Sequence, residues 1–209
     1  MAMLYFHSDD FGFSRGISDK IIEAIENGIV SSVSLVANGN DINRVKTYTK
    51  KNLIKKYVHI NLTEGKTISI NQNVQNKLTD KNNFLCNSFF SLEMKWLVSR
   101  KEEKNNIENA IYSEILSQIS QVCDLKNEDI LIDGHEHIHM SPLIFKSILQ
   151  INANYKIKKI RLSNEIFLFK SSFLMKKYFY INFVKFLILR ILSLIYKPIL
   201  KEKKIEHDD

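Results

Sequence analysis

Three histidines within five residues are the part of this sequence where groups able to do chemistry are most concentrated. Residues 133–139 (DGHEHIH) hold half of the six histidines in the chain. On an extended backbone, imidazoles at alternate positions project from the same side. Neutral imidazole nitrogens are favoured ligands for divalent metals. We therefore predict that His135, His137 and His139 lie at a metal or catalytic site, rather than in a polar loop where they only form hydrogen bonds.

Candidate ligands also follow or lie in two other predicted strands. Asp9 and Asp10 follow a strand predicted over residues 3–7, and His59 lies in an alternating segment over 57–62. The carboxyl ends of parallel strands meet at one edge of a sheet, so these groups are expected to converge there. A carboxylate with two imidazoles suits a catalytic divalent ion, which activates water while a second carboxylate takes the proton. Adjacent side chains point apart on an ideal strand, so both aspartates reach one site only where the strand turns, and residues 11–12 (FG) supply that turn. Taken alone, the Asp-Asp pair before Phe-Gly favours an ordinary turn or cap.

The elements that must position these groups alternate along the chain. Helices are predicted from an N-cap at Ser18 to Gly28, from Asp41 to Lys51, over 105–123 from apolar residues at helical spacing, and from Pro142 with Ser141 as its cap. Further strands are predicted over 29–36, 129–132 and 158–162, and residues 64–92 show no clear period. Strands that alternate with helices predict an α/β fold with parallel strands, as an open sheet or a barrel.

Length and composition indicate one globular core in a reducing compartment. The chain has 209 residues, of which 44% are hydrophobic and 25% charged, as in ordinary globular proteins. Cys86 and Cys123 are too few for a disulfide framework. The first ten residues lack the basic and apolar regions of a signal peptide. We therefore expect a cytoplasmic protein.

The C-terminal region is basic and rich in apolar residues. Residues 146–209 contain 14 Lys or Arg against 5 Asp or Glu, and residues 173–200 are mostly apolar but interrupted by lysines and an arginine. The region has no nucleic-acid-binding motif, so no nucleic-acid partner is expected. The segment 173–200 is interpreted first as a helix packed on the domain, then as an interfacial helix that contacts a membrane surface, and last as a spanning helix, because Lys185 and Arg190 would lie near the membrane centre.

Five sequence blocks occur in order along the chain: residues 8–14 (SDDFGFS), 27–38 (NGIVSSVSLVAN), 59–65 (HINLTEG), 133–142 (DGHEHIHMSP) and, more faintly, 161–165 (RLSNE). Taken together and in this order, they resemble the YdjC/ChbG-like carbohydrate deacetylases. The resemblance implies a distorted or incomplete (β/α) barrel with parallel strands, related to the NodB-type polysaccharide deacetylases. It implies hydrolysis of an N-acetyl group from an amino sugar or oligosaccharide.

The same resemblance implies roles for individual residues. Asp10, His59 and His135 would hold one divalent metal ion, with Mg²⁺ implied most directly and Zn²⁺ or Co²⁺ as alternatives. Asp9 would be the general base that deprotonates the attacking water. Contact with the substrate, or orientation of the metal ligands, is expected of four further residues: His137, His139, Asn61 and Arg161.

The sequence also departs from the family pattern. The resemblance implies a His-Pro stretch near the C-terminus, which this chain lacks, and the last barrel strands are expected to be replaced by the segment 173–200. We therefore divide the chain into a deacetylase-like domain over 1–170 and a C-terminal helix and charged tail over 171–209, and a homodimer is one expected assembly. An alternative function is a catalytically degenerate homologue that binds metal or glycan at a membrane surface. A metal-dependent phosphoesterase is a weaker alternative, because such sites usually have more ligands for two ions.

Overall fold

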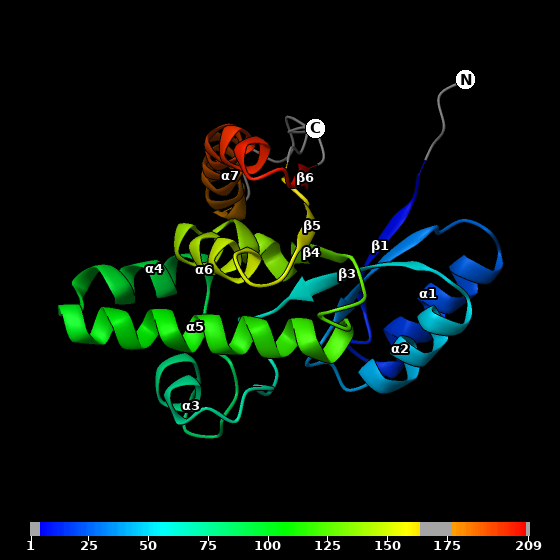
Figure 1. The fold of residues 1–209 in the computed structure, drawn as a ribbon, viewed down its shortest axis with the longest axis horizontal. Helices are drawn as coiled ribbons and strands as arrows, with labels where there is room; N and C mark the ends of the chain where they lie inside the picture. The colour runs from blue at the N-terminus through cyan, green and yellow to red at the C-terminus, as the bar shows by residue number, and fades with distance from the viewer. Residues whose placement is uncertain (1–4, 164–176, 208–209) are drawn as a thin grey trace.

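The fold is built on one parallel sheet. A computed structural model of the chain describes residues 5–163 and 177–207. In that part of the chain the sheet has six strands in sequence order, and every neighbouring pair is parallel (Figure 1). The strands are β1 (His7–Phe11), β2 (Ser32–Val36), β3 (Lys55–Ile60), β4 (Ile130–Gly134), β5 (Ile157–Ile160) and β6 (Glu206–His207).

Helices connect the strands. The long helix α5 and helix α6 lie side by side, whereas α1 and α2 lie near the other end of the molecule (Figure 1). The bounds are α1 (Arg15–Glu26), α2 (Ile42–Lys51), α3 (Gln72–Leu78), α4 (Phe89–Val98), α5 (Lys101–Val122), α6 (Pro142–Asn152) and α7 (Lys177–Glu202). The observed α2, the body of α5 and the start of α6 at Pro142 confirm the predicted helices.

Several predicted boundaries are wrong. Within the described residues the first strand begins at His7 and contains the acidic pair, which was predicted to follow the strand. Residues 3 and 4 of the predicted strand lie outside the described residues. Ser14 caps α1 by accepting a hydrogen bond from the backbone N–H of Ile17, while Ser18 is buried one turn inside the helix. The second strand begins at Ser32 rather than residue 29, because Ile29 is half exposed after the turn at Gly28. Residues 64–92 contain the short helix α3 and the start of α4.

The core is apolar and sits around the central strand. All five residues of β4 are buried. The predicted helical spacing in α5 is confirmed, since Ile107, Ile111, Ile115 and Ile119 are all fully buried. Burial of a large aliphatic side chain contributes roughly 1.5–3 kcal/mol each. This packing holds β3 and β4 in place, and these strands end at the candidate site.

The sheet curls without closing. Arg161 follows β5, yet its guanidinium donates a 2.8 Å hydrogen bond to Asp9 in β1. Strands β1 and β5 are separated by three others in the sheet, so this contact requires strong curvature. Within the described residues β1 and β6 are not paired. The predicted fold class, an incomplete (β/α) barrel, is confirmed.

The C-terminal segment folds back onto the sheet. In α7, Leu189, Tyr196 and Leu200 are buried. The Tyr196 ring stacks on Phe145 of α6 with centroids 3.7 Å apart, and its hydroxyl donates to the Met140 carbonyl. This contact confirms a helix packed on the domain. A strand nonetheless follows the segment, because β6 pairs with β5. Within 5–163 and 177–207, no helix combines the length and apolar character needed to cross a bilayer.

Candidate metal centre and catalytic pocket

A bulge in β1 turns two adjacent aspartates toward one pocket. The pairing with β2 shifts register between Ser8 and Phe11, and Asp10 has a left-handed φ of 63°. Such a bulge re-aims side chains that would point apart on a regular strand. Both Asp9 and Asp10 line one cavity of about 150 Å³. The strand had to break for both to reach one site, but it breaks at Asp10, one residue before the predicted Phe-Gly turn.

The histidine run is not extended, so the argument from alternate positions was wrong. Residues His135–Met140 form a 3₁₀ turn in which Glu136 and His137 have φ of 51° and 62°. The three rings consequently meet different partners. His135 contacts Asp10, His137 lies 2.7 Å from the Ser163 hydroxyl, and His139 donates to the backbone carbonyl of Arg161. All three still line the pocket with the aspartates.

Asp10, His59 and His135 form what we call the metal cluster. Asp10 Oδ1 lies 2.8 Å from His135 Nδ1 and 3.4 Å from His59 Nε2. One ligand atom from each residue lies within 4.8 Å of the others. His59 donates its Nδ1–H to Asp133 at 2.7 Å, which leaves Nε2 directed at Asp10. A carboxylate behind a histidine is the usual support for a metal ligand, so these residues fit a divalent ion.

The pKa values of the metal cluster favour a positive charge at this position. Burial acts to lower the pKa of His59, but the charge of Asp133 and hydrogen bonds to Asp10 and Asp133 raise it to about 9. The hydrogen bond to Asp10 raises the pKa of His135. Hydrogen bonds from these two histidines hold the pKa of Asp10 well below its usual range. Without a metal, protons on the imidazoles supply the positive charge that a divalent ion would otherwise bring.

Asp9, His7, Asp133 and Arg161 form a second group, which we call the base cluster. The Arg161 guanidinium lies 2.8 Å from Asp9 Oδ1 and 3.2 Å from Asp133 Oδ2, and His7 Nε2 lies 3.2 Å from Asp9 Oδ1. Asp133 also accepts a short hydrogen bond from the Ser34 hydroxyl. Burial acts to raise the pKa of Asp9, but the His7 hydrogen bond and the Arg161 charge lower it. Asp9 is therefore held as a carboxylate.

The remaining predicted residues occupy different places. His137, His139 and Arg161 line the pocket, whereas Asn61 does not. The Asn61 side chain is buried and bonds to the loop that follows β3, including the backbone of Glu64. That loop brings the Glu64 carboxylate 3.1 Å from His135 Nε2. Asn61 thus shapes the loop beside the metal cluster.

His139 is a buried, neutral imidazole. Burial lowers its pKa to about 4. Its Nδ1 has no hydrogen-bond partner among the described residues. The ring packs so closely on Gly134 that a Cβ at that position would lie 2.6 Å from Nδ1. Glycine at the end of β4 is therefore needed for this packing.

The sequence argument missed the roles of His7 and Asp133. His7 and Asp9 are two residues apart on β1, so period-two alternation already placed them on one face. Asp133 stood at the end of the predicted fourth strand without an assigned role. The approach of His7 in β1 to Asp133 in β4, with Nε2 3.6 Å from Oδ2, depends on the curvature of the sheet, which no local pattern specifies.

Comparison with known proteins gives one family. The family model described as YdjC-like protein matches residues 3–206. Chitooligosaccharide deacetylases from Salmonella paratyphi B, Salmonella typhimurium and Citrobacter koseri are each 28% identical over 72% of this chain and 56% of their own length. The chain thus spans about half the length of these relatives. A crystal structure from Enterococcus faecalis, described as a candidate cellobiose-phosphate cleavage protein, matches with a TM-score of 0.56 at 21% identity, over 78% of this chain and 59% of the other. That similarity concerns the fold alone.

Proposed function

The chain belongs to the YdjC-like protein family, and we propose that it is a metal-dependent deacetylase that hydrolyses the N-acetyl group of an amino sugar or oligosaccharide. One observation carries the proposal. The bulge in β1 places Asp10 against two imidazoles and its neighbour Asp9 against a guanidinium, within the same pocket. Two adjacent carboxylates in different charge environments suit a metal ligand and a general base.

The roles follow from the contacts of each residue. Asp10, His59 and His135 would hold the divalent ion, which when bound polarises the substrate carbonyl and lowers the pKa of water. Asp9 takes the proton of the attacking water, because Arg161 and His7 keep it ionised without occupying both of its oxygens. Asp133 fixes the tautomer of His59. His137 and His139 line the pocket beside these groups.

We propose magnesium as the ion, on the family resemblance, with zinc and cobalt as the alternatives that two imidazoles and one carboxylate also accept. The proposed substrate is an N-acetylated amino-sugar oligosaccharide, supported by the names of the Salmonella and Citrobacter relatives. We also propose that the protein acts in the cytoplasm.

Acetate release tests the proposal directly. Purified protein is stripped with chelator, reloaded with Mg²⁺, Zn²⁺ or Co²⁺, and incubated with N,N′-diacetylchitobiose and longer oligomers. We expect acetate with at least one metal, and elemental analysis should show about one ion per chain that His135→Ala loses. A folded protein that releases no acetate with any of these metals and substrates contradicts the proposal.

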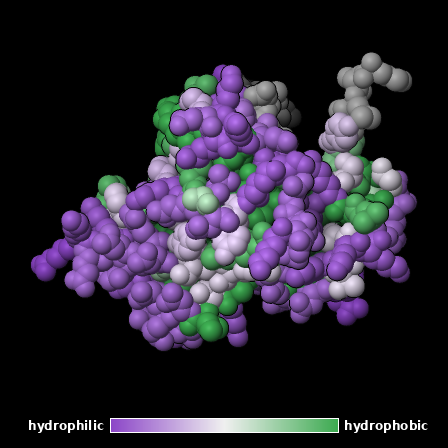
Figure 2. Space-filling model, viewed as in Figure 1, coloured by the Kyte–Doolittle hydropathy of each residue, from purple (hydrophilic) through white to green (hydrophobic). Residues whose placement is uncertain are grey.

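One surface favours a second candidate function, contact with a membrane surface. The face of α7 that points away from α6 carries exposed apolar side chains at helical spacing, and Figure 2 shows hydrophobic patches among hydrophilic residues around this helix. The residues are Phe183, Val184, Leu187, Ile191, Leu194 and Ile195. Arg190 and several lysines lie on the same helix. Apolar residues beside basic ones suit an anionic lipid surface.

Vesicle flotation separates the two candidates. Retention by phosphatidylserine vesicles but not by phosphatidylcholine vesicles, lost in Leu187→Gln/Leu194→Gln, supports membrane contact. If retention comes with no acetate release, the degenerate, membrane-surface homologue is favoured over the enzyme. A concentration-dependent dimer in light scattering, abolished by the same double substitution, would instead assign this face to a second copy.

A further inference from the structure

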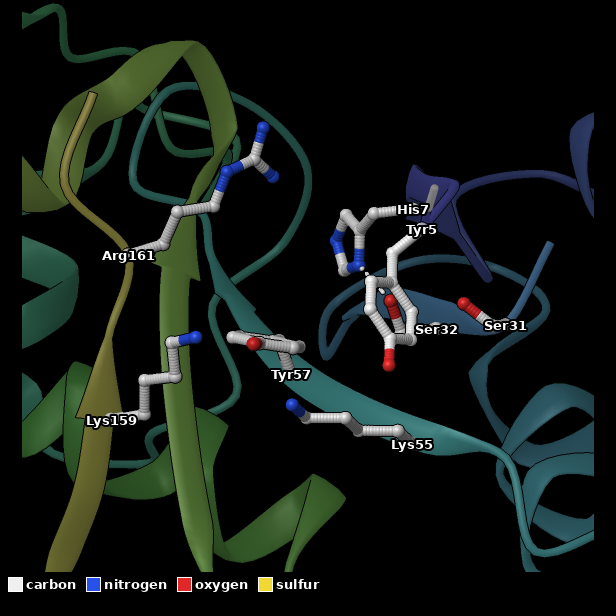
Figure 3. Close-up of a pocket in the computed structure, with 8 residues that line it drawn as sticks. All are labelled: Tyr5, His7, Ser31, Ser32, Lys55, Tyr57, Lys159 and Arg161. Atoms are coloured by element: carbon white, nitrogen blue, oxygen red, sulfur yellow. Dashed lines mark hydrogen bonds between the residues drawn. The ribbon is translucent and has the colours of Figure 1, made fainter. Parts of the chain in front are cut away.

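A second cavity lies on the concave side of the curled sheet, outside the catalytic pocket. Its volume is about 560 Å³. Figure 3 shows Arg161 and Lys159 along one wall, Tyr5, His7, Ser31 and Ser32 along the other, and Lys55 and Tyr57 of β3 between them. Of the residues that the structure describes, Arg161 alone lines both cavities.

The lining is unlike the interior of a packed barrel. Closed (β/α) barrels fill this space with layers of branched apolar side chains. Here the positions facing inward from β1, β2, β3 and β5 carry hydroxyl, imidazole, phenol and ammonium groups. These polar side chains leave the space between them open instead of packing it as an apolar core. The cavity falls within the 300–1,000 Å³ that is usual for a small-molecule site.

The charge of the lining has one sign. Lys55, Lys159 and Arg161 are cations, and among the described residues that line the cavity none carries a carboxylate. Arg161 is also paired with Asp9 and Asp133 of the base cluster, so the two lysines are the main charged groups of the cavity. The catalytic pocket differs, because four of its lining residues are Asp or Glu. Lys55 Nζ lies 5.5 Å from the centre of the Tyr57 ring, and both lysine amino groups are directed toward that ring (Figure 3). Ammonium groups and hydroxyls that converge in this way are donors suited to an oxyanion.

We propose that this cavity binds a small oxyanion, with Lys55 and Lys159 as its main charged contacts and the Tyr57 hydroxyl as a further donor. Arg161 contributes its charge at the upper end of the cavity while its NH1 remains on Asp9 and Asp133. The volume leaves room for an organic group attached to the anion. This inference is independent of catalysis at the metal cluster.

Equilibrium dialysis of the full chain with radiolabelled inorganic phosphate tests the inference. The protein is first stripped of metal with chelator, so that phosphate cannot be held by an ion at the metal cluster. We expect one saturable phosphate site per chain that sulfate displaces and that chloride at equal ionic strength does not. Lys55→Gln and Lys159→Gln should each weaken binding by about tenfold or more, as expected for loss of a charged hydrogen-bond donor.

Lys158→Gln is the matched control. Lys158 is adjacent to Lys159 on β5, so it points to the opposite face, where it pairs with Asp129. It should leave phosphate binding unchanged, and thermal melts should show that all three variants fold. Absence of saturable binding in folded metal-free protein overturns the inference. An equal loss in Lys158→Gln also overturns it, because the effect would then reflect overall charge. No turnover is measured, so failure here is distinguishable from failure of the proposed deacetylase activity.

Discussion

The metal cluster and the base cluster are built from neighbouring aspartates, yet they differ in the positive charge that faces each carboxylate. Asp10 faces two imidazoles, which can give up their protons to a metal. Asp9 faces Arg161, whose guanidinium keeps its charge at any physiological pH. By geometry alone, His7, Asp9 and Asp133 could also gather around an ion. Arg161 already occupies that position, so we propose one metal ion at the metal cluster and a general base, Asp9, at the base cluster.

The largest expected effect separates the two aspartates. Asp9→Asn should lower the rate of acetate release by at least about 10²–10⁴-fold while the protein keeps its metal. Asp10→Asn should lose the metal, and its activity should recover in part at high metal concentration. Turnover and elemental analysis of both variants measure this. If Asp9→Asn lost the metal and Asp10→Asn retained it, the assigned roles would be reversed.

Asp133→Asn tests the residue shared by both clusters. Its carboxylate accepts from His59 and from Arg161, so the change weakens the support of one metal ligand. We expect metal affinity to fall about 10–100-fold, measured by competition with a chromogenic chelator. An unchanged affinity would show that His59 is oriented by other contacts. Ser34→Ala, which removes a neutral donor to the same carboxylate, serves as the milder control.

The pH dependence of stability and of metal affinity should show that the charge on the imidazoles of the metal cluster can be removed, unlike that of Arg161. The pKa of His59 is raised from 6.5 to about 9, so its contribution to folding is complete below pH 6.5 and is lost as pH rises through about 9. The metal-free protein should therefore lose thermal stability between pH 6.5 and 9. Metal affinity should rise over the same interval, by up to about tenfold per pH unit for each proton displaced. Melting curves with chelator and with metal test both, and a flat metal-free curve would contradict the raised pKa.

Substitution of His7 should have a smaller effect than the changes above. Because Arg161 still holds Asp9, His7→Asn should lower turnover only about two- to tenfold, with metal content unchanged. Steady-state kinetics beside elemental analysis provide the measurement. Loss of metal in this variant would show that the two clusters are not separable. Ser32→Ala, which removes one partner of the His7 ring, should have a smaller effect still.

Local patterns were sufficient for much of the fold. The isoleucine spacing of α5, the Ser141-Pro142 start of α6 and the apolar run of β4 each depend on neighbours within a few residues, and each was predicted close to its observed place. The convergence of Asp10, His59 and His135 followed from parallel strand order, which the structure shows.

The missed features depend on contacts distant in sequence or on rare backbone conformations. The left-handed φ values at Asp10, Glu136 and His137 are conformations that non-glycine residues seldom adopt, so alternation wrongly predicted extended backbone at the histidine run. The contact between Arg161 and Asp9 spans 152 positions and exists only because the sheet curls. Such contacts require the curvature to be known before the residues can be paired.

The bulge in β1 gives the two aspartates different partners through one extra residue in the strand, because the two side chains are chemically identical. Two residues of β1, Asp9 and Asp10, span the interval that one residue of β2 spans. Deleting either aspartate would restore regular pairing and leave a single carboxylate to serve as both ligand and base. A designer who transplants this centre into another barrel must first copy the length of that strand, and only then its chemistry.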